Sequence, residues 1–151
     1  MSTLTSLSRI DRTITIKAPP ERVYQALTTV AELSKWFQTT VEGEIAVGNE
    51  VWMSSHGQRF RVVFVEMSPP RRFVWRWHPG RVDPAVDYSK EPRTTVTFTL
   101  EPNADGTLLR VSETGFDEIS LARRASVYED NTGGWTEVTQ WLRDYVETPN
   151  G

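Results

Sequence analysis

The sequence predicts an α+β fold in which one long C-terminal helix covers a curved antiparallel sheet of about six to seven strands. Apolar residues alternate with a period of two over most of the stretch from Thr39 to Gly115, and short turns separate the alternating runs. After Ile119 the apolar spacing becomes helical. Strands joined by such short turns form a meander. Because only one long helix can cover the sheet, we expect the sheet to curve around it.

The first segments predict one strand followed by two short helices. Residues 1–8 are rich in Ser and Thr, and we expect them to be flexible. Residues 10–17 alternate and predict a strand with one buried face, on which Arg12 is the polar exception. Pro20 suits the first turn of the first helix. The second helix is predicted over 31–37, where it ends in an aromatic pair.

The remaining strands are predicted from alternating runs between Gly, Pro and Asn turns. They cover residues 41–45, 51–53, 59–67, 72–78, 94–101 and 107–115. Parity places Phe73, Trp75 and Trp77 on one face of their strand, and Glu66 on the same face as Phe64. Residues 78–92 contain three prolines and predict an exposed loop.

The last helix carries a wide apolar stripe at spacings of three and four. Its members are Trp135, Val138, Trp141, Leu142 and Tyr145, and Leu121, Ala125 and Tyr128 extend it toward the helix start. Gly133 and Gly134 interrupt it, although each interior glycine costs about 1 kcal/mol relative to alanine. We expect either a bend or a need for room beside Trp135. The stripe is either ordinary core or one wall of a cavity.

Composition limits the function further. A chain of 151 residues, 1–151, suits a single domain. With 17 Lys and Arg against 20 Asp and Glu, a nucleic-acid partner is not expected. There is no cysteine, so thiolate chemistry and disulfides are excluded. No run reaches the length of a membrane span or has the pattern of a signal peptide, and we expect a soluble cytoplasmic protein.

Four stretches resemble one known superfamily. They are residues 16–24 with Leu33, Trp36 and Phe37; residues 63–77; residues 94–116; and Gly134-Trp135 with Val138 and Leu142. In this order they are similar to the START-like helix-grip superfamily (SRPBCC). More narrowly, they resemble the branch named for the C-terminal domain of the activator of heat shock protein 90 ATPase. The resemblance spans nearly the whole chain.

The resemblance implies a helix-grip fold with an apolar cavity between sheet and helix, which relatives use for lipids, polyketides or other hydrophobic molecules. We therefore expect a small hydrophobic ligand and a binding protein rather than an enzyme. No cofactor is expected. The residues expected to contact the ligand are Trp36, Phe60, Phe64, Phe73, Trp75, Trp77, Phe98, Val111, Glu113, Trp135, Val138 and Trp141.

Glu113 is the most interesting polar residue, because its parity with Leu109 and Val111 points it inward. It could fix a ligand by accepting a hydrogen bond, or it could pair with an arginine such as Arg12. No catalytic residue is assigned. The alternative function is a cyclase- or hydrolase-type enzyme in which Glu113 is the acid or base. Glu113 is the only candidate for such a catalytic role.

A third hypothesis is a protein-interaction, co-chaperone-like module, in which a protein partner docks on the 78–92 loop or on a basic cluster. The cluster contains Arg71, Arg72, Arg76 and Arg81, and it predicts a solvated sheet face or an anchor for an anionic group. His56 and His78 have no acidic partner at metal-ligand spacing, so no metal site is expected.

Overall fold

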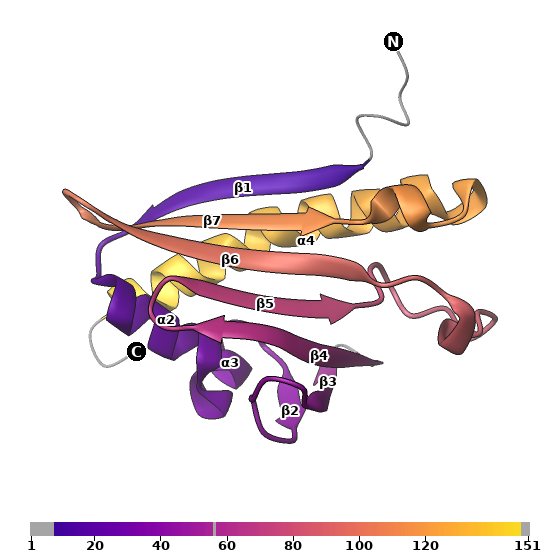
Figure 1. Cartoon of the computed structure of the whole chain (residues 1–151), viewed down its shortest axis with the longest axis horizontal. Helices are drawn as coiled ribbons and strands as arrows, with labels where there is room; N and C mark the ends of the chain where they lie inside the picture. Colours follow the sequence, from indigo (N-terminus) through magenta and orange to yellow (C-terminus); the bar gives the residue numbers. More distant parts are fainter. Residues whose placement is uncertain (1–7, 56, 149–151) are drawn as a thin grey trace, which may run out of the picture.

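The computed structural model describes residues 8–55 and 57–148 and has the predicted α+β helix-grip architecture (Figure 1). Seven antiparallel strands form a single sheet in the order β1-β7-β6-β5-β4-β3-β2. They are β1 (Arg9–Ile16), β2 (Thr40–Glu42), β3 (Glu50–Ser55), β4 (Gln58–Ser68), β5 (Arg72–Trp77), β6 (Thr94–Asn103) and β7 (Gly106–Thr114). The predictions made for residues 1–7 and for His56 lie outside the described residues.

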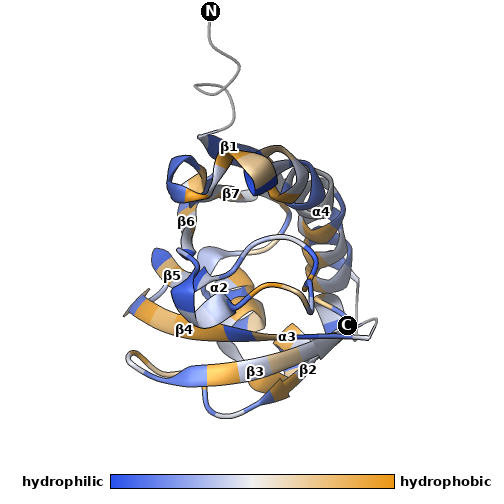
Figure 2. Ribbon diagram, turned by 90° about the vertical axis from the view of Figure 1, so that its right-hand side faces the viewer, coloured by the Kyte–Doolittle hydropathy of each residue, from blue (hydrophilic) through white to orange (hydrophobic). Residues whose placement is uncertain are grey.

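Three α-helices lie against this sheet: α2 (Pro20–Thr28), α3 (Val30–Trp36) and α4 (Leu121–Glu147). Two 3₁₀ turns, Tyr88–Lys90 and Phe116–Glu118, complete the described structure. Figure 2 shows that the sheet curls and that α4 lies across its open side. None of the helices in residues 8–55 and 57–148 combines the length and the apolarity that a membrane span requires.

The predicted aromatic face of β5 is confirmed, because Phe73 and Trp75 are fully buried and Trp77 is 9 % exposed. Neighbouring strands add rings to the same inner face. Phe64 stacks on Phe73 with ring centroids 5.6 Å apart, and Phe98 lies 4.9 Å from Trp75. These rings form an aromatic cluster within a core that also contains many aliphatic side chains.

The predicted orientation of Glu66 is wrong. A β-bulge between Phe64 and Glu66 shifts the register, so that Phe64 pairs with Trp75 but Glu66 pairs with Val74. One extra residue in a strand reverses the facing of every residue beyond it. Glu66 therefore lies on the outer face, where its carboxylate accepts a hydrogen bond from Arg72 Nε at 3.0 Å.

The first part of the predicted α4 stripe is confirmed at Tyr128, which packs against the core, but it is wrong at Leu121 and Ala125. Leu121 is 64 % exposed and Ala125 is exposed, whereas Val127 is buried. The buried face of α4 follows residues 127, 135, 138, 139 and 142. The polar amide Asn131 lies on this face, one turn before Trp135, and it interrupts the apolar pattern by which the face could have been recognised.

The glycine pair does not interrupt α4, which is helical from Leu121 through Glu147. A Cβ added to Gly133 or Gly134 would meet no other atom within 4 Å. Gly133 is exposed and Gly134 is half-buried. No close contact therefore requires a glycine at either position, and Gly134 lines a hollow beside Trp135.

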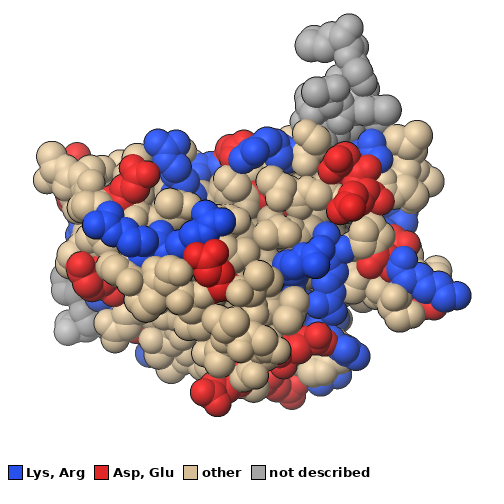
Figure 3. Space-filling view, viewed as in Figure 1, with Lys and Arg blue, Asp and Glu red and all other residues tan. Residues whose placement is uncertain are grey.

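The outer face of the sheet carries Lys and Arg side chains interspersed with Asp and Glu (Figure 3). Arg71, Arg72, Arg76 and Arg81, which form the predicted basic cluster, are all exposed. Exposed charges of both signs are what a solvated sheet face requires.

Candidate functional site

Glu113 lies at the centre of a buried hydrogen-bond network and is itself 0 % exposed. Its Oε1 accepts hydrogen bonds from Trp135 Nε1 and Asn131 Nδ2, both at 2.8 Å. Its Oε2 accepts from Trp77 Nε1 at 2.8 Å and from Thr94 Oγ1 at 2.5 Å, and Asn131 Nδ2 is also 3.0 Å away. Both carboxylate oxygens are therefore occupied by protein donors.

The four partners of Glu113 are neutral. An indole N–H and an amide NH₂ can only donate, so three of the four partners suit an ionised carboxylate as acceptor. The pairing with Arg12 that parity allowed is not seen. Arg12 instead reaches α4, where its Nη2 donates to the Thr132 carbonyl at 3.0 Å and its Nε to Thr136 Oγ1 at 3.2 Å.

The network joins three strands to the last helix. Glu113 lies one residue before the end of β7 and pairs with Val96 of β6, while Trp77 ends β5 and pairs with Thr94. Asn131 and Trp135 are four residues apart in α4, so both side chains lie on one helical face. The inward direction predicted for Glu113 is confirmed, and it brings the carboxylate to the seam between sheet and helix.

A small apolar hollow lies beside this network, and we call it the tryptophan pocket. Its volume is about 120 Å³, and it is lined by Phe37, Trp77, Asn131, Gly134, Trp135 and Val138. Three of these six lining residues are direct hydrogen-bond donors to Glu113. The hollow lies between the sheet and α4, where the sequence placed a cavity.

The predicted contact residues separate into distinct groups. Trp77, Trp135 and Val138 line the tryptophan pocket. Phe64, Phe73, Trp75, Phe98 and Val111 are buried in the core, and Trp141 packs against it while partly exposed. Trp36 is buried in α3 and donates from its indole nitrogen to the Ala26 carbonyl at 2.7 Å. Phe60 lines a second hollow.

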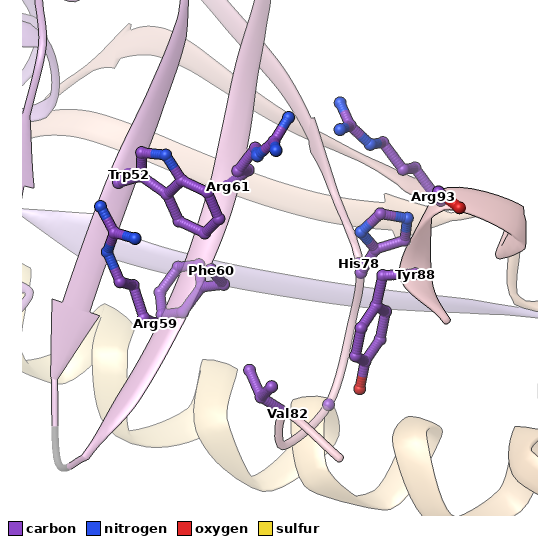
Figure 4. A pocket seen from close by; sticks show the side chains of 10 residues that line it. Trp52, Arg59, Phe60, Arg61, His78, Val82, Tyr88 and Arg93 are labelled. Carbon is purple, nitrogen blue, oxygen red and sulfur yellow. The ribbon is translucent and has the colours of Figure 1, made fainter. Parts of the chain in front are cut away.

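That second hollow, the arginine pocket, has a volume of about 250 Å³ and lies where the β3–β4 hairpin meets the 78–92 loop (Figure 4). Its lining residues are Trp52, Arg59, Phe60, Arg61, His78, Gly80, Val82, Tyr88, Ser89 and Arg93. The sequence did not predict this pocket as a whole, because its walls come from separate segments of the chain.

The 78–92 loop is fastened to α4. Gly80 N donates to Asn131 Oδ1 at 2.9 Å, and Arg81 N donates to Asp130 Oδ2 at 3.2 Å. Gly80 has a φ of +83°, and a Cβ there would lie 2.8 Å from Val127 Cγ1, so only glycine permits this close approach. Asn131 thus links the loop on one side to Glu113 on the other.

Burial lowers the pKa of His78 below its usual 6.5, although the hydrogen bond between Nε2 and the Glu91 carbonyl acts in the opposite direction. The unfolded chain therefore binds the proton more readily than the folded one in the range just below 6.5. The contribution of a neutral His78 to stability is complete above that range and is lost as the pH falls through the folded pKa.

We expect His78→Gln to remove this pH dependence of stability, because a glutamine side chain does not titrate, while the glutamine amide can still donate to the Glu91 carbonyl. The difference in free energy of unfolding between the wild type and His78→Gln should decrease between about pH 7 and pH 5. Urea unfolding followed by circular dichroism at several pH values measures it. A difference that stays constant, or that grows toward acid pH, would contradict the neutral state of His78.

Within the described parts of the chain, no three His, Asp or Glu side chains gather closely enough to hold a metal ion.

Several residues that line the tryptophan pocket were not predicted from the sequence as site residues. Asn131 is not among the sequence-predicted site residues, although its spacing of four from Trp135 places it on the same helical face. Gly134 was noted for room but not assigned to a site. Phe37 belongs to the predicted aromatic pair at a helix end and to the residues that carry the resemblance, but it was not predicted to line a site.

The curled sheet, the two short helices after β1 and the long C-terminal helix define a member of the START-like helix-grip class, whose fold is a ligand-binding one. Residues 17–147 match the family model described as "Activator of Hsp90 ATPase homolog 1-like protein". The chain belongs to that family.

Three solved structures illustrate the similarity. Protein MLL2253 from Mesorhizobium loti is 28 % identical, with 92 % of this chain and 96 % of that chain covered and a TM-score of 0.74. Protein CV1439 from Chromobacterium violaceum is 25 % identical, with 94 % and 99 % covered and a TM-score of 0.72. The Aha1 dimer from Colwellia psychrerythraea shares the fold at 24 % identity, with 95 % and 98 % covered and a TM-score of 0.75. No curated protein matches the chain.

Proposed function

We propose that this protein binds a small hydrophobic molecule in the tryptophan pocket, between the curved sheet and α4. The observation that carries the proposal is that an apolar hollow lies beside Gly134, a helix position where an added Cβ would meet no atom of a neighbouring element within 4 Å. A glycine in a helix interior costs about 1 kcal/mol relative to alanine, so its presence is better explained by the space that it leaves.

The size of the pocket limits which ligands it can hold. Pockets for drug-sized molecules measure roughly 300–1,000 Å³, whereas an apolar core cavity of about 150 Å³ takes up benzene. The tryptophan pocket, at about 120 Å³, accordingly suits one aromatic ring or one short alkyl group. A lipid or polyketide would place only such a part of its structure inside.

Glu113 serves this pocket by holding its walls. Its carboxylate fixes Trp77, Asn131 and Trp135 by hydrogen bonds of 2.8 Å. Since both oxygens already accept from protein donors, we assign Glu113 a positioning role, with no direct bond to a ligand. This arrangement favours binding over the alternative in which Glu113 acts as an acid or base, because that chemistry needs a carboxyl group within reach of a substrate.

The test uses toluene as a probe and the six tryptophan indole N–H signals as reporters in a ¹H–¹⁵N NMR spectrum. We expect toluene to shift the signals of Trp77 and Trp135 and to leave that of Trp52 in place. Gly134→Leu should fill the pocket and weaken toluene binding by about tenfold or more, which corresponds to a loss of about 1.4 kcal/mol.

Gly133→Leu is the matched control, because it makes the same change in helix propensity at an exposed neighbouring position. It should leave toluene binding unchanged, and both variants should be at least as stable as the wild type. If Gly134→Leu bound toluene as well as Gly133→Leu does, the tryptophan pocket would not be the binding site.

A further inference from the structure

The arginine pocket is a second hollow that is independent of the tryptophan pocket. Figure 4 shows Trp52, Phe60 and the two arginines of β4 on one side, and His78 and Tyr88 on the other. The rings of His78 and Tyr88 lie 5.1 Å apart, so this side presents a paired aromatic surface. Two aromatic walls around about 250 Å³ suit a flat molecule of one or two rings.

The same pocket is positively charged. Arg59, Arg61 and Arg93 line it, and none of its ten lining residues is acidic. The guanidinium carbon atoms of Arg59 and Arg61 lie 4.0 Å and 4.7 Å from the centre of the Trp52 ring, which holds both side chains along the wall.

These arginines keep donors for a ligand. A guanidinium group has five N–H donors. Arg59 gives Nη2 to Glu42 at 2.9 Å, and Arg61 gives Nη1 to Glu50 at 2.7 Å. Arg93 approaches the same Glu50 with Nη2 at 3.6 Å. Each guanidinium thus commits one nitrogen to a carboxylate outside the lining, and other N–H groups remain.

The wall opposite β4 adds no competing anion. His78 is neutral around pH 7 because burial lowers its pKa, and its Nε2 lies against the Glu91 carbonyl. The backbone N–H and the hydroxyl of Ser89 both donate to Asp87 Oδ1. Asp87 itself is not one of the lining residues. Glu42 and Glu50 offset part of the charge of Arg59, Arg61 and Arg93, but three guanidinium groups outnumber these two carboxylates, so a ligand carboxylate would meet a net positive charge.

We propose that the arginine pocket binds an aromatic carboxylate of one or two rings. The ring system lies between Trp52 with its two stacked arginines on one side and the His78–Tyr88 pair on the other. The carboxylate accepts hydrogen bonds from Arg61 and Arg93, which already converge on Glu50. Planar guanidinium groups suit such a carboxylate because they can bind both of its oxygens.

The experiment compares 2-naphthoate with 2-naphthalenemethanol, which has the same rings without the charge. Binding is measured by calorimetry, and the Trp52 indole N–H signal locates it. We expect 2-naphthoate to shift the Trp52 signal and to bind about tenfold more tightly than the alcohol, since a charge-assisted hydrogen bond contributes more than a neutral one. Raising the salt concentration should weaken the binding of 2-naphthoate and leave that of the alcohol unchanged.

The double variant Arg61→Gln/Arg93→Gln should reduce the affinity for 2-naphthoate by about tenfold and leave the alcohol unchanged. Its matched control is Arg71→Gln/Arg110→Gln, which changes two exposed arginines outside the pocket and should bind like the wild type. Circular dichroism verifies that both double variants are folded.

Three results would overturn the proposal: equal affinity for the acid and the alcohol, unchanged naphthoate affinity in Arg61→Gln/Arg93→Gln, or a shift at Trp135 in place of Trp52. The toluene experiment reads the tryptophan pocket through Trp77 and Trp135. Either pocket can consequently fail its own test without affecting the other.

Discussion

Glu113→Ala should lower the free energy of unfolding by about 3–5 kcal/mol, because it removes the shared acceptor of four buried hydrogen-bond donors. The substitution leaves the indole N–H groups of Trp77 and Trp135, the Asn131 amide and the Thr94 hydroxyl without their shared acceptor. Each buried donor that stays unsatisfied costs about 1–3 kcal/mol. Relaxation and water entry into the vacated space keep the total below the sum of the four.

Glu113→Gln separates charge from volume. Glutamine fills nearly the same space, but its NH₂ group must face donors where an oxygen now accepts. We expect a loss of about 2–3 kcal/mol, comparable with hydrogen bonds to a charged group. Thr94→Val removes one donor and keeps the carboxylate paired with three others, so its loss should be about 1 kcal/mol.

Urea unfolding of these variants provides the measurement, and Glu101→Ala, an exposed glutamate on β6, provides the control. The indole N–H signals of Trp77 and Trp135 should also move in Glu113→Gln, while that of Trp52 stays. If Glu113→Ala were within about 1 kcal/mol of Glu101→Ala, the network would not stabilise the fold.

The inward parity of Glu113 could be predicted from the sequence because β7 is regular as far as this residue. Its partners could not be predicted, since they come from β5, β6 and α4 and their meeting depends on how the sheet curls. Arg12 shows the same limit. Parity marked it as an exception on a buried face, but its contact with the Thr132 carbonyl spans 120 positions in the sequence.

Local irregularities explain why other predictions from periodicity were wrong. The bulge beside Val65 reversed Glu66, and nothing in the alternating pattern of β4 indicates an extra residue. In α4, the polar Asn131 occupies a core-facing position between Val127 and Trp135. Because it breaks the apolar pattern of the true face, periodicity favoured Leu121 and Ala125, which are exposed. The arginine pocket could not be predicted because parity within one strand does not show which loop lies opposite it.

Trp75→Ala should be the most destabilising change in the core, with a loss of about 3–5 kcal/mol. Trp75 is 0 % exposed, and its ring lies within 6.5 Å, between centroids, of five other aromatic rings. Those rings belong to Phe37, Phe73, Trp77, Phe98 and Trp135. Because they come from β5 itself, from β6, from the end of α3 and from α4, they cannot all move in to fill the cavity.

Trp75→Phe should cost much less than its alanine counterpart, for a reason particular to this residue. The indole nitrogen of Trp75 is buried and has no hydrogen-bond partner among the described residues. Replacing indole by phenyl loses contact area but also removes an unsatisfied donor, which by itself costs about 1–3 kcal/mol. The two effects oppose one another, and we expect a net loss of about 1–2 kcal/mol.

Trp135→Phe is the matched comparison, because Trp135 is a neighbouring buried tryptophan whose indole nitrogen donates to Glu113. The same change of ring there breaks a hydrogen bond to a carboxylate and should cost about 1–3 kcal/mol more than Trp75→Phe. Urea unfolding of both variants gives this difference directly. Equal losses would mean that the Trp75 N–H is satisfied after all, for instance by a buried water, and that its burial imposes no penalty on the core.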